Sequence, residues 1–296
     1  MNMDEKKSTI SKIWNKAPLI IRSIILGFTI STIGVLTWSV LATFVPLPWS
    51  FILMMAFLWF YIKYLSGSWN PKHTKLFRKQ NFRNPKLSLN AWFLSIVGIT
   101  LIVLIEQSGL IVTFRLMEFP AERFSREYSF LENVPAWAAW LVVIMISAVA
   151  GICEEIGFRG YMQVPLEKKY GPLMAISIGS IIFVIVHLHQ AWSGPLIFQI
   201  FFISVLFGSI AYYSNSLIPG IIAHFIMDIC NFSFWWSKLG HQFDKKTILE
   251  TGIDYHFIIW NGTFLISIGL FIYVMSRLKS IKNNIRLDIK TPANNV

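Results

Sequence analysis

The chain has 296 residues, of which 55% are hydrophobic and only 14% charged, and its formal net charge is +11. A soluble domain carries about a quarter charged residues, so this composition excludes an ordinary soluble protein. Runs of about 20 apolar residues recur, each long enough to cross a bilayer as a helix. The strict alternation of a membrane β-barrel is absent. We therefore predict an all-α, polytopic membrane protein.

The apolar runs follow one another along most of the chain, separated by short polar connections. They predict about eight transmembrane helices. Their approximate ranges are 19–45, 49–65, 90–113, 135–162, 172–191, 195–214, 217–236 and 256–276.

The basic residues are concentrated in alternate connections. The segments 1–22, 63–90, 163–171 and 277–296 carry five, seven, two and five basic residues against two, none, one and one acidic residues. The connections on the other side have no basic excess. Because Lys and Arg collect on the cytoplasmic side, both termini are expected in the cytoplasm. The net charge thus indicates topology and attraction to anionic lipid, and no nucleic-acid partner is expected.

Three apolar stretches carry polar groups in their interior, namely 154-EEIGFR-159, 183-FVIVH-187 and 224-HFIMD-228. Ionisable residues within membrane spans are costly and usually serve a function. A single intramembrane histidine often only links helices by hydrogen bonds, and Glu155 with Arg159 alone resembles a structural ion pair. The occurrence of all these groups on neighbouring helices is hard to explain by packing. They therefore form the candidate site.

Helix geometry suggests how these groups meet. A hairpin around Tyr170-Gly171-Pro172 would join the fourth and fifth spans, and Glu154 and His187 are equally distant from that turn. They should lie at similar depth. Glu155 and Arg159 are four residues apart and share a helix face, whereas Glu154 points about 100° away from Glu155 in an α-helix.

These pairings suggest chemistry. Glu154 is left without a partner on its own helix and is suited to act as a general base. His187 beside it can help to hold and deprotonate water. His224 shares a face with Asp228 and can stabilise an oxyanion. The two cysteines, Cys153 and Cys230, lie in apolar segments and are expected to be free thiols.

The order EExxxR, FxxxH and HxxxD resembles the CAAX prenyl endopeptidase and bacteriocin-processing (CPBP, or Abi) family of intramembrane proteases. The similarity extends from about Pro135 to Trp236. The resemblance implies that Glu154 activates water with help from His187. It also implies that His224 and Asp228 line the oxyanion site. Residues Glu155, Arg159 and Phe183 would support the site.

The resemblance also divides the chain into three parts. Residues 1–134 form an N-terminal region of three helices with a basic cytoplasmic loop, and residues 135–236 form the CAAX-protease-like catalytic domain. Residues 237–296 contain the final loop, the last transmembrane helix and the basic tail.

The sequence leaves the metal question open. Residues Glu154, His187, His224 and Asp228 are all competent Zn²⁺ ligands, but the HExxH spacing of zinc proteases is absent. We favour a glutamate-type reaction without a cofactor and keep zinc as the alternative. An ionised Asp228 would repel an oxyanion, so it must be protonated, orient His224 or bind a metal.

The preferred function is an intramembrane endopeptidase that cleaves membrane-associated proteins or peptides. One alternative is a non-catalytic scaffold or bacteriocin self-immunity protein that keeps the protease fold. The other is an ion-coupled transporter, although the internal repeats common in transporters are not seen. Short loops without a targeting extension favour a bacterial plasma membrane. The expected partners are a peptide or membrane-protein substrate and the lipid bilayer; the sequence does not reveal the oligomeric state.

Overall fold

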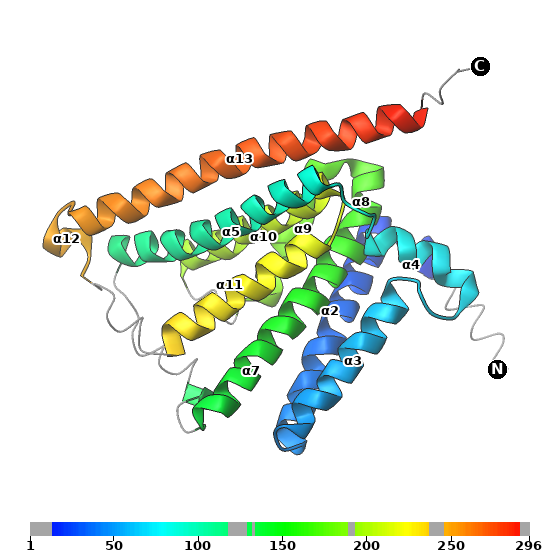
Figure 1. The fold of residues 1–296 in the computed structure, drawn as a ribbon, viewed down its shortest axis with the longest axis horizontal. Helices are drawn as coiled ribbons and strands as arrows, with labels where there is room; N and C mark the ends of the chain where they lie inside the picture. Colours follow the sequence, from blue (N-terminus) through cyan, green and yellow to red (C-terminus); the bar gives the residue numbers. More distant parts are fainter. Residues whose placement is uncertain (1–13, 118–128, 132–133, 189–192, 237–245, 291–296) are drawn as a thin grey trace.

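A computed structural model describes residues 14–117, 129–131, 134–188, 193–236 and 246–290 of the chain. These residues form helices joined by short connections, and none of them lies in a β-strand, as the composition predicts (Figure 1). The principal helices are α2 (Leu19–Phe44), α3 (Trp49–Leu65), α4 (Lys75–Phe82), α5 (Leu89–Leu116), α7 (Ala136–Val149), η3 (Ala150–Met162), α8 (Gln163–Tyr170), α9 (Pro172–Val186), α10 (Gly194–Ser214), α11 (Ile218–Trp236) and α13 (Tyr255–Lys290). Three short helical turns complete them: η1 (Lys72–Thr74), η2 (Ser129–Leu131) and α12 (Ile248–Thr251).

Each of the eight predicted spans corresponds to an apolar helical segment, but their lengths differ. Within the described residues, five segments are long and apolar enough to cross a membrane: Leu19–Phe44, Leu89–Leu116, Ala136–Tyr170, Gly194–Ser214 and Tyr255–Asn284. The other three are shorter: Trp49–Leu65, Pro172–Val186 and Ile218–Phe234. The chain is therefore a multi-pass membrane protein, while the count of eight crossings, the cytoplasmic termini and the division at residues 134 and 236 stay predictions.

The segment with the two adjacent glutamates is not a uniform α-helix. Helix η3, which continues directly from α7, is a π-helix of 13 residues. Its hydrogen bonds run from residue i to i+5, which makes the helix wider, and such segments are frequent at functional sites. The α-helical rotation assumed for Glu154 therefore does not apply here, because the hydrogen-bonding pattern of the backbone is different.

Helix α2 packs along η3 at very short range. A Cβ atom added to Gly157 of η3 would lie only 2.5 Å from the carbonyl oxygen of Gly27 and 2.9 Å from the backbone nitrogen of Ser31. No larger residue fits at Gly157 unless the two backbones separate. This contact fixes α2 against the back of the segment that carries the candidate site.

Two hydrophobic clusters lie on either side of η3. One is formed by buried residues of α5, α10, α11 and α13, and it includes Ile102, Phe207 and Phe271. The other is formed mainly by α2, α3, α7 and η3, and it includes Met54 and Ile156. Helix α13 lies along α5 on the outer side of the first cluster (Figure 1).

The predicted hairpin between α8 and α9 is present. Gly171 has a φ of +84°, a conformation that glycine adopts without steric cost, and Pro172 begins α9. Helix α9 ends at Val186, earlier than the predicted span 172–191, whose last residues lie outside the described part. His187 therefore lies just after a helix end and not within a helix.

Candidate active site

Glu154 and His187 meet across the hairpin, in agreement with their equal distances from the turn. The Oε2 atom of Glu154 lies 3.7 Å from Nε2 of His187. This separation is too long for a direct hydrogen bond. Oε2 is buried and accepts no hydrogen bond from the described residues. Glu154 is thus a largely buried carboxylate with one oxygen directed at an imidazole nitrogen.

The end of α9 determines which nitrogen of His187 faces Glu154. Nδ1 lies 2.8 Å from the carbonyl oxygen of Phe183, one of the carbonyls that the helix end leaves without an intrahelical donor. A carbonyl oxygen can only accept, so Nδ1 carries the proton of this bond. In the neutral imidazole Nε2 then has a lone pair, and this lone pair faces the carboxylate of Glu154.

Glu155 and Arg159 form a fully buried ion pair, as their spacing predicts. Nη1 of Arg159 lies 3.0 Å from Oε1 of Glu155, and both side chains are at most 2% exposed. Nη2 of Arg159 donates to Oγ of Ser204 on α10, at 2.9 Å. The arginine therefore links η3 to α10, a contact that the sequence motifs did not predict.

His224 is held by the same glutamate. Its Nδ1 lies 3.0 Å from Oε1 of Glu155, and because the carboxylate of an ion pair accepts, Nδ1 is the donor. On the other side of the ring, Nε2 lies 3.7 Å from Oδ2 of Asp228. His224 therefore lies between two acidic side chains, and Arg159, Glu155, His224 and Asp228 form one connected row from η3 to α11.

Aromatic rings fix the position of these polar groups. Phe183 stacks on His187 with ring centroids 4.2 Å apart, and the guanidinium carbon of Arg159 lies 4.5 Å from the centroid of Phe183. Phe207 of α10 stacks on His224 at 4.7 Å. Because rings restrict rotation of the groups they cover, Phe183 connects the two halves of the site, in keeping with its predicted supporting position.

The four possible zinc ligands do not form one ligand set. Among the described residues, no group of three or more His, Cys, Asp or Glu side chains is placed to hold a metal ion. Glu154 pairs with His187, whereas His224 pairs with Asp228 and uses Nδ1 for Glu155. The residues as arranged do not fit a zinc ion, so no step below involves one.

A polar cluster beside the site escaped the sequence motifs. Glu106 of α5 is buried, and it accepts hydrogen bonds from Nε2 of Gln199 at 3.2 Å and Nδ2 of Asn231 at 3.4 Å. Gln107 also donates to Asn231. Because Asn231 follows Asp228 by three residues on α11, the cluster adjoins the site on the same helix face. The position of Glu106 near a span end gave no signal of this.

Carboxylates and imidazoles gathered among the helices of a multi-pass membrane protein are the composition expected of an intramembrane protease. Residues 135–230 match the family described as Rce1-like, type II CAAX prenyl endopeptidase Rce1-like. This match confirms the resemblance given by the three motifs and identifies about a third of the chain as a domain of the CAAX prenyl endopeptidase and bacteriocin-processing family. Comparisons with curated proteins and with solved structures found no match. The family supports a CAAX-type protease that acts on peptide substrates.

Proposed function

We propose that the protein is an intramembrane endopeptidase in which Glu154 and His187 activate water. The observation that carries this proposal is the buried Oε2 of Glu154, which accepts no hydrogen bond and lies 3.7 Å from Nε2 of His187. A water molecule can donate one hydrogen to each of two acceptors at this separation. Its oxygen lone pairs then remain available for attack on a peptide carbonyl carbon.

In the proposed reaction the water oxygen bonds to the carbonyl carbon while Glu154 takes the water proton. The carbonyl oxygen becomes an oxyanion. The C–N bond then breaks, and Glu154 passes the proton to the leaving amine. The products are a carboxylate and an amine, so protons and charge balance without a cofactor.

We place the oxyanion at His224. As a donor to it, His224 carries a proton on each nitrogen, and Nδ1–H is already directed to Glu155. Nε2–H is then available to the oxyanion. The contact with Glu155 supports this form of the ring, because a carboxylate favours the imidazolium. Asp228 serves as the orienting partner of His224, which resolves the repulsion that an ionised aspartate would exert on the oxyanion itself.

We further propose a membrane-associated protein or peptide as the substrate and a bacterial plasma membrane as the location. The basic connections lie at one end of the helices: α4, α8 and the end of α13 are together on the right of Figure 1. This arrangement supports a cytoplasmic position for these segments. A cleavage site near that face follows from the position of the hairpin.

The test compares membrane peptidomes of cells that produce the wild type or Glu154→Gln. This substitution keeps the size of the side chain and removes the base. We expect peptides that accumulate with the wild type and are absent with the variant. Glu250→Gln, which alters an exposed carboxylate in α12, is the matched control and should give the wild-type pattern.

A purified variant must first show wild-type thermal stability, so that loss of cleavage reports chemistry and not folding. A substrate verified with the wild type and cleaved equally well by Glu154→Gln would contradict the proposed mechanism. Peptidomes that do not differ between wild type and variant, with both proteins folded, would instead favour a non-catalytic membrane protein.

A further inference from the structure

A large pocket lies at the end of the molecule where α4, α8 and α10 meet the end of α13. Its volume is about 1080 Å³, and its lining comes from α4 and the segment that follows it, the start of α5, α8, the end of α10, and α13. It is separate from the candidate active site, none of whose residues lines it. The catalytic motifs give this pocket no role.

The lining is strongly basic. It contains Lys79, Arg83, Lys86, Lys168 and Lys282, whereas Glu167 is the one acidic residue among the described residues that line it. Five cations against one carboxylate leave a large positive surplus in a concave space, where charges of one sign reinforce one another.

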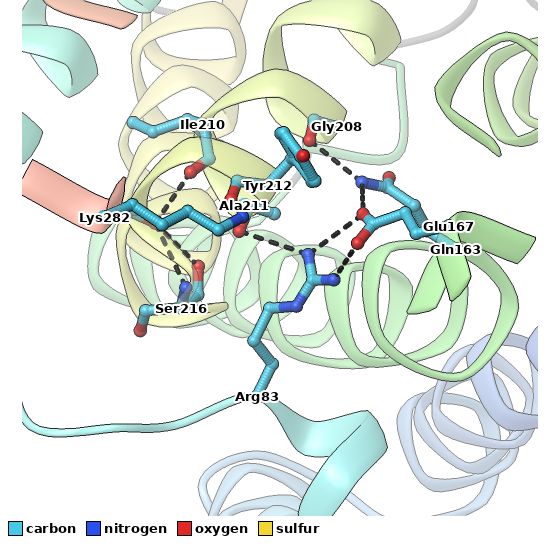
Figure 2. A network of polar contacts seen from close by, with 10 residues as sticks. Arg83, Gln163, Glu167, Gly208, Ile210, Ala211, Tyr212, Ser216 and Lys282 are labelled. Atoms are coloured by element: carbon cyan, nitrogen blue, oxygen red, sulfur yellow. Dashed lines mark hydrogen bonds and ion pairs between the residues drawn. The ribbon is translucent and has the colours of Figure 1, made fainter. Parts of the chain in front are cut away.

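The single carboxylate cannot neutralise the lysines, because it is fully engaged. Figure 2 shows Arg83 directed at Glu167, with which it forms an ion pair through both carboxylate oxygens. Nη1 of Arg83 also donates to the carbonyl of Ala211, at 3.2 Å. Nε2 of Gln163 donates to Oε1 of Glu167, at 2.7 Å. This network forms a fixed floor and leaves the lysines as the groups available to a ligand.

The lysines that line the pocket are not held by carboxylates in the same way. Lys79 and Lys86 are exposed. Lys168 reaches only the neutral amide of Gln80, at 3.4 Å. Lys282 donates to the carbonyl of Tyr212 at 2.7 Å and lies over the ring of that tyrosine. An ammonium group has three donors, so contacts of this kind leave capacity for an anion.

The opposite wall is apolar. It includes Ala91 of α5 and Leu278 and Ile281 of α13, and both helices belong to the segments long enough to span a membrane. A pocket with lysines on one side and apolar helix surface on the other suits the boundary between lipid headgroups and acyl chains. Basic pockets between transmembrane helices are known to hold phosphate-bearing headgroups.

We propose that this basic pocket binds a phosphate-bearing anion. Two sources provide the same chemistry: the headgroup of an anionic membrane lipid, and a soluble phosphate ester. The bound phosphate would be held by the lysines of α4, α8 and the segment before α5, while the glycerol or sugar part of the ligand would contact the apolar wall.

The experiment measures binding of phosphatidylglycerol and of phosphatidylcholine to the purified full-length protein by native mass spectrometry. The test variant is Lys79→Gln/Lys86→Gln. The matched control is Lys72→Gln/Lys75→Gln, which removes the same charge from exposed lysines of the same connection that do not line the pocket. We expect the test variant to bind phosphatidylglycerol roughly tenfold more weakly. The control should bind it as the wild type does.

A competition with glycerol 3-phosphate distinguishes the two sources. Displacement of bound phosphatidylglycerol at millimolar concentration supports a site that recognises the phosphate itself. Binding of glycerol 3-phosphate that depends on Lys79 and Lys86, without retention of the lipid, also supports the site and assigns it to a soluble ester. Equal loss of lipid binding in both variants, or no loss in either, overturns the proposal, because a diffuse basic surface would then be sufficient. Equal retention of phosphatidylcholine and phosphatidylglycerol by the wild type overturns it as well.

Discussion

Replacement of Arg159 by methionine is expected to destabilise the protein by about 3–5 kcal/mol, the cost of removing one partner from a buried ion pair. The change leaves Glu155 in a site where its side chain has no exposure. One of its oxygens keeps the hydrogen bond from His224, while the other has no hydrogen-bond partner among the described residues. Methionine has a similar length and can refill the space among the aromatic rings. The loss is therefore attributed to charge and not to a cavity.

A double-mutant cycle with Glu155→Gln separates this term from packing. Each single variant leaves one buried charge unpaired, whereas the double variant leaves none. The double variant should consequently be more stable than the sum of the single effects predicts, by about 2 kcal/mol. Unfolding of the full chain in mixed micelles, followed by circular dichroism during titration with dodecyl sulfate, provides the free energies.

Arg277→Met is the matched control for this cycle. It makes the same chemical change at an exposed position of α13, where substitutions usually alter stability by no more than about 0.5 kcal/mol. The reasoning is refuted if Arg159→Met costs less than about 1 kcal/mol, or if the two single effects simply add.

Three further predictions concern other contacts. Gly157→Ala should cost about 1–3 kcal/mol because its Cβ would collide with the backbone of α2, whereas Gly179→Ala, with open space around it, should be neutral or stabilising in the same unfolding assay. Asp254 has a pKa lowered to about 2, chiefly by its hydrogen bond from Arg115. Since its folded pKa is depressed, it stabilises the fold above about pH 4, and this contribution is lost as the pH falls towards 2; Asp254→Asn should abolish that part of the pH dependence, and an unchanged slope would be evidence against the pairing. Gln199→Leu should cost about 1–3 kcal/mol, since it removes hydrogen bonds to the buried glutamate of α5, and a neutral result would mean that this glutamate finds another donor.

The contacts that depend on one helix or one hairpin could be predicted from the sequence. The Glu155–Arg159 pair follows from a spacing of four residues, and the approach of Glu154 to His187 follows from equal distances to the turn at Gly171. Both arguments need only the local geometry of the chain.

Contacts that depend on a third helix could not be predicted in this way. The hydrogen bond between Glu155 and His224 requires the depth of α11 relative to η3, and the sequence provides no distance between them. The link from Arg159 to Ser204 has the same origin, because serine is common in membrane helices and gives no special signal. The π-helix was also missed, since hydrophobic periodicity does not distinguish it from an α-helix over so short a segment.

The continuous path from η3 through α8 to the turn at Gly171 has a consequence for how related chains can differ in length. Removing one residue from a helix rotates everything beyond it by about 100°. A deletion between Glu155 and Arg159 would turn the guanidinium away from the carboxylate, and one between Arg159 and Gly171 would misplace His187 relative to Glu154. Gains and losses of residues should therefore accumulate in the loops, while the distance from Glu154 to His187 stays constant wherever the reaction is retained.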